Sequence, residues 1–214
     1  MIVLLSAIAG LVDVISFLTL KIFAAHVTGN LVLIAPVLVG GRSPRPDQDL
    51  AVPVFVLATA VAWLIARASG LQGVHLVRLL LVGQFVLLAV VLLISIQHRP
   101  SVNQGGVMFT MDAMVAVSAI AFQFALLRII IPNAPSTAVM TGNLSTSVLA
   151  FLDLMARKPL VKDARERLRK QFSLLLGFFG GCIAGAAAVR WWGDWAWSLP
   201  VLLAALTVPL TAKM

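Results

Sequence analysis

The sequence predicts an all-α integral membrane protein with about six transmembrane helices and two shorter apolar helices. Three observations lead to this prediction: 61% of the residues are hydrophobic, 11% are charged, and the apolar residues fall in long blocks. A soluble domain normally carries about 25% charged residues. Barrel strands would instead show alternating polarity over about ten residues. Because only helices or closed barrels satisfy the backbone in lipid, the long blocks indicate helices.

Charge and cysteine content exclude several classes of protein. The chain has 16 Lys and Arg against 8 Asp and Glu, a net charge of +8. In a membrane protein such an excess gathers in cytoplasmic loops, so we expect a lipid bilayer, and no nucleic acid, as partner. The one cysteine, Cys182, cannot form an internal disulfide, and no metal-ligand cluster accompanies it. We therefore expect a packing residue here and no cofactor.

The first half of the chain contains four apolar segments. The first is not a cleaved signal by its pattern, because it lacks a basic start and Asp13 interrupts its apolar run. The second is short, opens with Thr-Gly-Asn and ends in GGRSPRPDQD, which predicts a loop over 40–49. The four segments cover residues 2–24, 28–40, 51–69 and 79–97, and the linker QHRPSVNQGG follows them.

The second half repeats this pattern. Its first segment is broken by PNAPS at 132–136, and its second is again short and again opens with Thr-Gly-Asn. A basic stretch at 153–170 precedes the last two segments, and the RWWGDWAW run between them is typical of an aromatic belt at a membrane interface. The four segments cover residues 107–131, 138–152, 171–190 and 195–211.

Segment length separates six spans from two shorter pieces. A spanning helix needs roughly 20 residues, which the segments at 28–40 and 138–152 do not reach. We therefore expect six transmembrane helices and two half-helices. The positive charge of the 153–170 loop places it in the cytoplasm. Eight full spans would give the same orientation, so charge does not fix the number of spans.

Internal similarity predicts two related halves. The tetrapeptide TGNL occurs at Thr28–Leu31 and at Thr141–Leu144. After each copy, small residues recur at a helical spacing that lets backbones approach closely. These residues are Ala58, Ala62 and Ala66 in the first half and Gly177, Gly181 and Gly185 in the second. We expect one membrane domain with repeats at 1–98 and 107–214 and a linker at 99–106. The short TGN segments favour inverted over parallel repeats.

The two TGN segments predict a binding site. Many secondary transporters contain repeats, and short segments at matching positions point to the substrate site. A helix that starts here presents free N–H groups and a partial positive charge, which suits a small anion or polar solute. The alternative is a tight turn with a helix cap. The predicted substrate-binding residues are Thr28, Gly29, Asn30, Thr141, Gly142, Asn143 and Gln123.

Ionisable residues inside apolar segments are costly and point to function. Asp13 is central in the first segment, so we expect it to act in coupling or gating. It carries a proton, pairs with a cation such as Arg128, or bonds to the backbone at a helix break. Arg128 and Lys21 lie where long side chains can reach the interface. His26 is interpreted as a polar packing group, and Asp112 as an interface residue.

Motifs for enzymatic chemistry are missing from the sequence. It has no Walker loop, no G-x-S-x-G, no HExxH and no CxxC, so we expect no enzymatic activity. The leading hypothesis is a small secondary transporter, and the alternative is a non-transporting membrane scaffold. A homo-oligomer is compatible with either. The basic stretch at 153–170 fits a solvated loop or an amphipathic helix on anionic lipid headgroups.

The runs AGLVDVISFL and FAAHVTGN resemble the YoaK-type bacterial membrane proteins, a family named as a domain of unknown function. Ala121 stands where that family has Gly, and Phe124 where it has Asn. The resemblance implies a bacterial inner-membrane protein of about six spans. If the family's Asn lines a polar site, the second-half site of this chain is altered or more apolar. The resemblance supplies no substrate. The matching positions are Gly10, Asp13, Thr28, Gly29, Asn30, Gln123, Ala125, Thr141, Gly142, Asn143, Gly177, Gly181 and Gly185.

Overall fold

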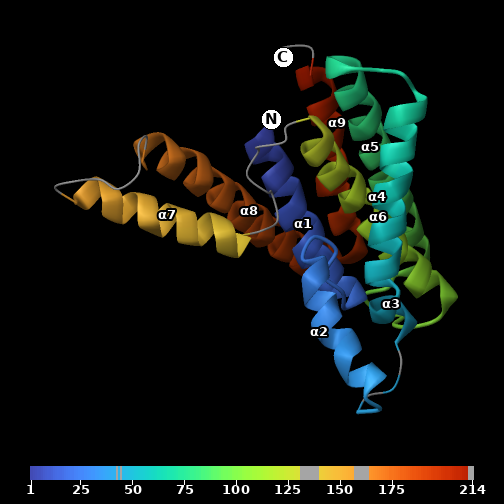
Figure 1. Ribbon diagram of the computed structural model, residues 1–214. Coiled ribbons are helices and arrows are strands. Elements are labelled where there is room, and N and C mark those ends of the chain that lie inside the picture. The colour runs from blue at the N-terminus through green and yellow to red at the C-terminus, as the bar shows by residue number, and fades with distance from the viewer. Residues whose placement is uncertain (42, 44, 131–139, 157–163, 212–214) are drawn as a thin grey trace.

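The computed structural model describes residues 1–41, 43, 45–130, 140–156 and 164–211, and the regular structure in these residues is helical (Figure 1). The elements are α1 (Ile2–Leu20), α2 (Val27–Leu38), α3 (Pro46–Asp49), α4 (Ala51–Ala68), α5 (Gly73–His98), α6 (Val107–Ile130), α7 (Met140–Met155), α8 (Ala164–Trp192), η1 (Gly193–Trp197) and α9 (Ser198–Leu210).

Five stretches of the described chain are long and apolar enough to cross a membrane. They are Ile2–Leu20, Pro46–Ala68, Gly73–His98, Val107–Ile130 and Arg165–Leu210. The last is 46 residues long, and η1 divides it into α8 and α9. The two TGN helices are shorter, with 12 residues in α2 and 16 in α7. The all-α membrane fold is therefore confirmed, with both TGN segments short as predicted.

The largest difference from the sequence prediction is at the basic stretch 153–170. It was predicted as a loop, but α7 continues to Met155 and α8 begins at Ala164. The residues of 164–170, which are Ala, Arg, Glu, Leu and Lys, are good helix formers. Glu166 and Lys170, one helical turn apart, form an ion pair with 2.6 Å between Oε1 and Nζ. This pair stabilises the first turns of α8. The PNAPS break at 132–136 lies outside the described residues.

Smaller differences occur at other boundaries. α1 ends at Leu20, before the predicted 24, because Lys21 adopts a left-handed conformation with φ 59°. α5 begins at Gly73 rather than 79. The predicted 40–49 loop contains the short helix α3, which starts with Pro46 and carries two aspartates in its first turn. Proline and acidic residues both favour a helix start.

The helices form a bundle from which two pieces project (Figure 1). α1, α4, α5, α6 and α9 run side by side, while α8 crosses α1 and carries α7 away from the bundle. α2 also points away from the bundle, beyond the end of α1. The amino end of α1, the carboxyl end of α9 and the turn between α4 and α5 lie at the same end of the bundle.

The helix contacts come in matching sets when the two halves are exchanged. α1 packs on α8 as α6 packs on α4, and α6 packs on α5 as α1 packs on α9. Within the halves, α2 packs on α4 as α7 packs on α8. Such an arrangement is the one expected from two related halves. The orientation of the repeats stays a prediction.

Small residues set the closest of these contacts, as the sequence predicted. A Cβ on Gly10 would overlap the backbone carbonyl of Phe178, and one on Gly181 would overlap that of Ala7. In the matching contact of α4 with α6, Ala62 is fully buried. Close backbone approach of this kind is the usual packing device in membranes. The rows of small residues therefore act as helix contacts.

Candidate functional site

The carboxylate of Asp13 holds the break between α1 and α2. Its Oδ1 accepts the backbone N–H of Ala25 at 2.8 Å and that of His26 at 3.2 Å. Its Oδ2 lies 2.6 Å from Nδ1 of His26. Of the three roles that the sequence allowed for Asp13, bonding to the backbone at a helix break is thus confirmed. Its observed ionic partner is His26, whereas Arg128 is exposed near the end of α6.

His26 connects this break to α8. Its side chain is 36% exposed, and its ring packs edge-on against Phe178 with centroids 5.3 Å apart. The hydrogen bond that Nδ1–H of His26 donates to Asp13 raises the pKa of His26 above 6.5. Partial burial opposes this rise, and the negative charge of Asp13 adds to it. Because Nδ1 faces Asp13, Nε2 is the nitrogen left for a ligand or a proton. The interpretation of His26 as a packing group alone is therefore too narrow.

The side chain of Asn30, in α2, binds the backbone of the connection between α1 and α2. Its Nδ2 donates to the carbonyl of Phe23 at 2.7 Å, and its Oδ1 accepts the N–H of Phe23 at 3.3 Å. The Asn30 side chain is fully buried. Two further side chains bind this connection, since Ser16 donates to Ile22 and Gln48 donates to Lys21. Irregular backbone within a membrane protein needs partners of this kind.

The other two residues of the first TGN motif lie at the start of α2. Thr28 is exposed, and Gly29 is half-buried above the ring of Phe23. The first turn of a helix leaves backbone N–H groups without a partner inside the helix. The motif is thus divided, because Asn30 faces inward to the α1–α2 connection while Thr28 faces outward.

The second TGN motif forms the first turn of α7. Thr141 and Gly142 are exposed, while Asn143 is buried and donates to the sulfur of Met140 at 3.8 Å. α7 packs along α8, whereas α2 packs on α3 and α4. The element common to both motifs is α8, since α7 lies along it and His26, just before α2, contacts its Phe178.

Gln123 lies in the centre of the bundle. Its Nε2 donates to the carbonyl of Leu5 at 2.9 Å, and its Oε1 accepts from Gln84 at 2.7 Å. Both glutamines are fully buried. This chain of hydrogen bonds joins α1, α5 and α6, and it gives Gln123 a structural position between three helices.

A second buried carboxylate, that of Asp112, lies near the start of α6. Asp112 is 1% exposed and accepts the hydroxyl of Ser95 at 2.6 Å. Its place at the membrane interface stays a prediction. Asp194 in η1 accepts both the N–H and the hydroxyl of Ser101. These bonds join α5, α6 and η1 where the linker between the halves begins.

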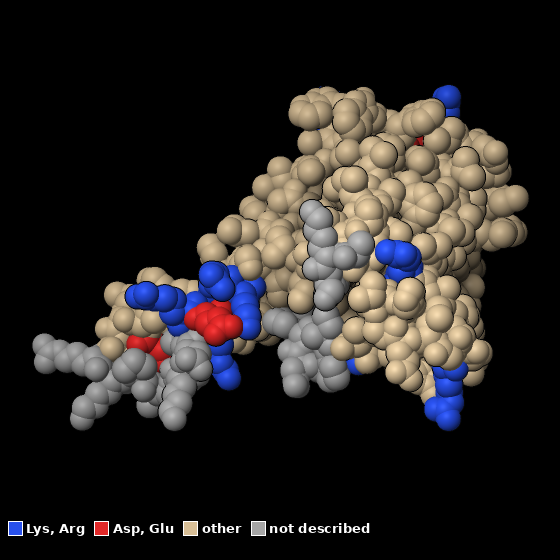
Figure 2. Space-filling model, turned by 90° about the horizontal axis from the view of Figure 1, so that it is seen from above, with Lys and Arg blue, Asp and Glu red and all other residues tan. Residues whose placement is uncertain are grey.

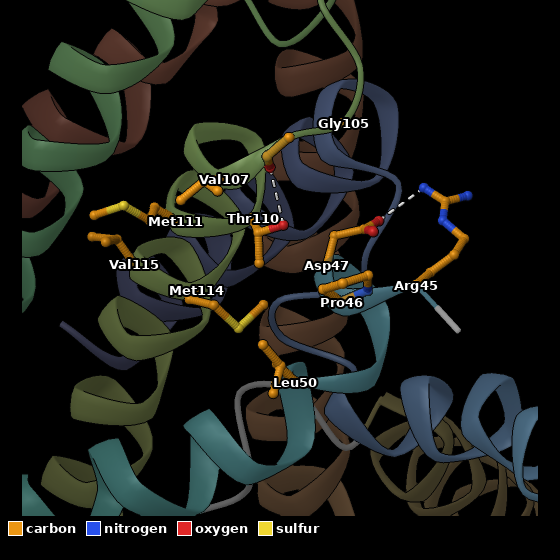
Figure 3. Close-up of a pocket in the computed structure, with 11 residues that line it drawn as sticks. Arg45, Pro46, Asp47, Leu50, Gly105, Val107, Thr110, Met111, Met114 and Val115 are labelled. Carbon is orange, nitrogen blue, oxygen red and sulfur yellow. Dashed lines mark hydrogen bonds and ion pairs between the residues drawn. The ribbon is translucent and has the colours of Figure 1, made fainter. Parts of the chain in front are cut away.

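Two open grooves lie on the surface of the described chain. The larger, about 720 Å³, lies where α3 and α4 meet the start of α6. Figure 3 shows Met111 and Met114 among the residues of α6 that line it, with the 2.8 Å ion pair of Arg45 and Asp47 on the side of α3. The other, about 590 Å³, is an apolar groove between α4 and α5 with Ser118 at its base. Both are mostly apolar, and neither is lined by the TGN residues.

Metal binding has no support in the described part of the chain. No group of three or more His, Cys, Asp or Glu side chains there could hold an ion. Cys182 packs against α1, with its sulfur 3.5 Å from the carbonyl of Gly10.

Comparison with protein families shows which family the chain belongs to. Residues 1–210 match the family described as "Protein of unknown function (DUF1275)". The chain belongs to this family. DUF1275 includes the YoaK-type proteins, so the resemblance found in the sequence is confirmed. No curated protein and no solved structure matches the chain.

Sequence reasoning missed the partner of Asp13 in this DUF1275 chain. His26 and Asp13 are 13 residues apart, and a connection without regular helix lies between them. Periodicity places residues on helix faces but does not say how such a connection folds back. The available signal was the pairing of an intramembrane carboxylate with a histidine directly before the TGN motif.

The His26–Asp13 pair makes stability depend on pH. A histidine whose pKa is raised by folding contributes stability that is fully present below pH 6.5 and is lost as pH rises through the raised pKa. We expect the thermal stability of the wild type to exceed that of His26→Gln by up to about 1 kcal/mol below this pH, and less above it. Thermal unfolding in detergent at a series of pH values measures this. The dependence should vanish in Asp13→Asn, and a difference independent of pH would contradict the assignment.

Proposed function

We propose that this DUF1275 protein is a small secondary transporter without enzymatic activity, whose binding site lies at the α1–α2 break. The observation that carries the proposal is the His26–Asp13 pair, which lies at a break between helices in a chain of apolar spans. Ionisable groups in such positions mark substrate paths and proton relays.

The chemistry of this break suits a small anionic or polar solute. His26 is partly exposed, and its raised pKa favours the imidazolium form. The start of α2 adds the exposed Thr28, while the N–H of Gly29 in the same turn already donates to the carbonyl of His26 at 2.8 Å. The helix N-terminus attracts negative charge, and the imidazolium of His26 offsets the charge of the Asp13 carboxylate beside it. Deprotonation of His26 would weaken that attraction, which gives a means of coupling binding to protons.

The matching helix contacts of the two halves support a transporter with related repeats. In such proteins the site lies where broken helices of both halves approach each other. In this proposal α8 supplies the second wall of the site, and Asn143 and Thr141 at the start of α7 act from the second half. Asn30 positions the backbone of the break, and Gln123 fixes α6 against α1.

A screen of solutes tests this function. We would add sulfate, phosphate, and small mono- and dicarboxylates to purified protein at pH 6 and measure thermal stability. A ligand at a hundred times its dissociation constant stabilises by about 2.7 kcal/mol. We expect at least one anion to stabilise the wild type and not His26→Gln. The control is His75→Gln, since His75 is exposed at the start of α5.

Two results would count against the proposal. One is a screen in which none of these anions stabilises the wild type. The other is an anion whose effect is the same in wild type and His26→Gln, because that anion would bind elsewhere. A positive anion should then be tested for uptake into liposomes, with and without a pH gradient.

The second candidate function is a membrane scaffold, and the projecting hairpin of α7 and α8 favours it. Its side chains include Leu149, 64% exposed, and Phe179, 63% exposed. These face either lipid or another membrane protein. A scaffold predicts no solute effect in any variant, together with a stable complex that survives detergent extraction.

A further inference from the structure

One face of α8 is apolar and covered by no other described helix. Phe172, Leu176, Phe179 and Ile183 are each more than half exposed. Their spacing of four, three and four residues places them in a single row along the helix. The residues of α8 that contact α1, such as Gly181, lie on another face.

The same row continues into positive charge at the start of α8. Arg169 precedes Phe172 by three residues, and Arg165 precedes Arg169 by four, so both lie on this face. Both are exposed. Figure 2 shows the Lys and Arg side chains gathered near that end of the α7–α8 hairpin. The neighbouring Lys170 is already paired with Glu166. The row therefore consists of two arginines followed by four apolar side chains.

The dimensions of this row match one leaflet of a bilayer. From Phe172 to Ile183 the helix rises about 16 Å at 1.5 Å per residue. Half of a hydrocarbon core of about 30 Å is similar. Arginine side chains at the end of such a row reach the headgroup region. An acyl chain would cover the apolar part while a phosphate meets the arginines.

We propose that this face, defined by Arg165, Arg169, Phe172, Leu176, Phe179 and Ile183, is a binding site for an anionic phospholipid. Arginine pairs with phosphate through two parallel hydrogen bonds, and the apolar row accepts the acyl chain. A free anion would use only the arginines, and the apolar row would add nothing to its binding. The proposal does not rest on transport, because it concerns a surface that the α1–α2 break does not share.

Lipid titration tests this site directly. Purified, delipidated protein is titrated with dioleoyl phosphatidylglycerol, dioleoyl phosphatidylcholine or inorganic phosphate, and binding is followed by native mass spectrometry and thermal stability. Phosphatidylglycerol should bind most tightly. Arg165→Gln/Arg169→Gln should weaken its binding roughly thirtyfold, since each arginine near an anionic headgroup contributes about a factor of five.

The control removes the same charge from the same turns. Arg167→Gln/Lys170→Gln changes residues outside the row and should weaken binding only a few fold. Leu176→Ser/Phe179→Ser tests the acyl contact with exposed positions that the fold does not need, and it should weaken phosphatidylglycerol binding several fold.

Four results would overturn the proposal. Equal loss in the two charge variants would mean unspecific attraction, and equal binding of phosphatidylcholine would mean that the arginines play no part. A stability gain from inorganic phosphate as large as that from the lipid would indicate an anion site. Unchanged lipid binding in Leu176→Ser/Phe179→Ser would show that the acyl chain lies elsewhere. The same result is expected if a protein partner, rather than lipid, covers this face.

Discussion

Replacement of Gly181 by alanine is expected to separate α8 from α1. The new Cβ would overlap the backbone carbonyl of Ala7, which cannot rotate away as a side chain could. Overpacking of this kind usually costs about 1–3 kcal/mol, and relief requires the two helices to move apart. At about 2–4 °C per kcal/mol for a chain of this size, the apparent Tm should fall by several degrees. Tryptophan fluorescence during heating in detergent reports it, since the chain has 5 Trp.

The adjacent glycine provides a matched control. Gly180 is exposed, and a Cβ there would meet nothing within 4 Å. Alanine at this helical position should leave stability unchanged or raise it by up to about 1 kcal/mol. The two variants differ by one position in the same helix and by the same added methyl group. If both behaved alike, the close contact of α1 with α8 would not be present in the protein.

A second variant in the contact between α1 and α8 tests whether the two glycines lose stability through the same separation of the helices. A Cβ on Gly10 would overlap the carbonyl of Phe178 across the same interface. Once Gly181→Ala has moved the helices apart, the Cβ of Gly10→Ala overlaps less with the carbonyl of Phe178. The double variant should therefore lose less stability than the two single losses added together.

The helical membrane fold and the short TGN helices could be predicted because they depend on composition and length. Apolar runs of about 20 residues and two shorter ones follow directly from the chain. The row of Gly177, Gly181 and Gly185 also predicted a close helix contact, although not that α1 is the partner. Charge patterning was less reliable, because the basic residues of 164–170 were assigned to a loop and form the first turns of α8.

The candidate site could be predicted only in part. Asp13 was singled out because an intramembrane carboxylate is costly, and its bonds to Ala25 and His26 explain how that cost is met. From the motif alone, Thr, Gly and Asn of each TGN copy are equally good candidates for binding. The fold separates them, because the connection from Lys21 to His26 turns back on α1 and needs Asn30 for its own hydrogen bonds. Such needs appear only when the backbone path is known.

Asn30→Ala is the variant that distinguishes a structural role of the first TGN motif from a role in binding a solute. Asn30 is fully buried, and both of its amide groups bind the backbone of Phe23. Alanine would leave the part-buried N–H and carbonyl of Phe23 without these partners. Each such group costs about 1–3 kcal/mol, so we expect a loss of about 2–4 kcal/mol in the absence of any ligand.

The control for Asn30 is Asn103→Ala. Asn103 donates one hydrogen bond, to the carbonyl of His98, and it is exposed, so its loss should change stability by no more than about 0.5 kcal/mol. Thermal unfolding of both variants without added solute gives the comparison. If Asn30 instead served mainly to bind a solute, its alanine variant would be as stable as Asn103→Ala and would lose only a solute-induced shift. A large loss without solute would make the side chain of Asn30 the element that fixes the α1–α2 break, and His26 and Thr28 the residues there that remain accessible to a ligand.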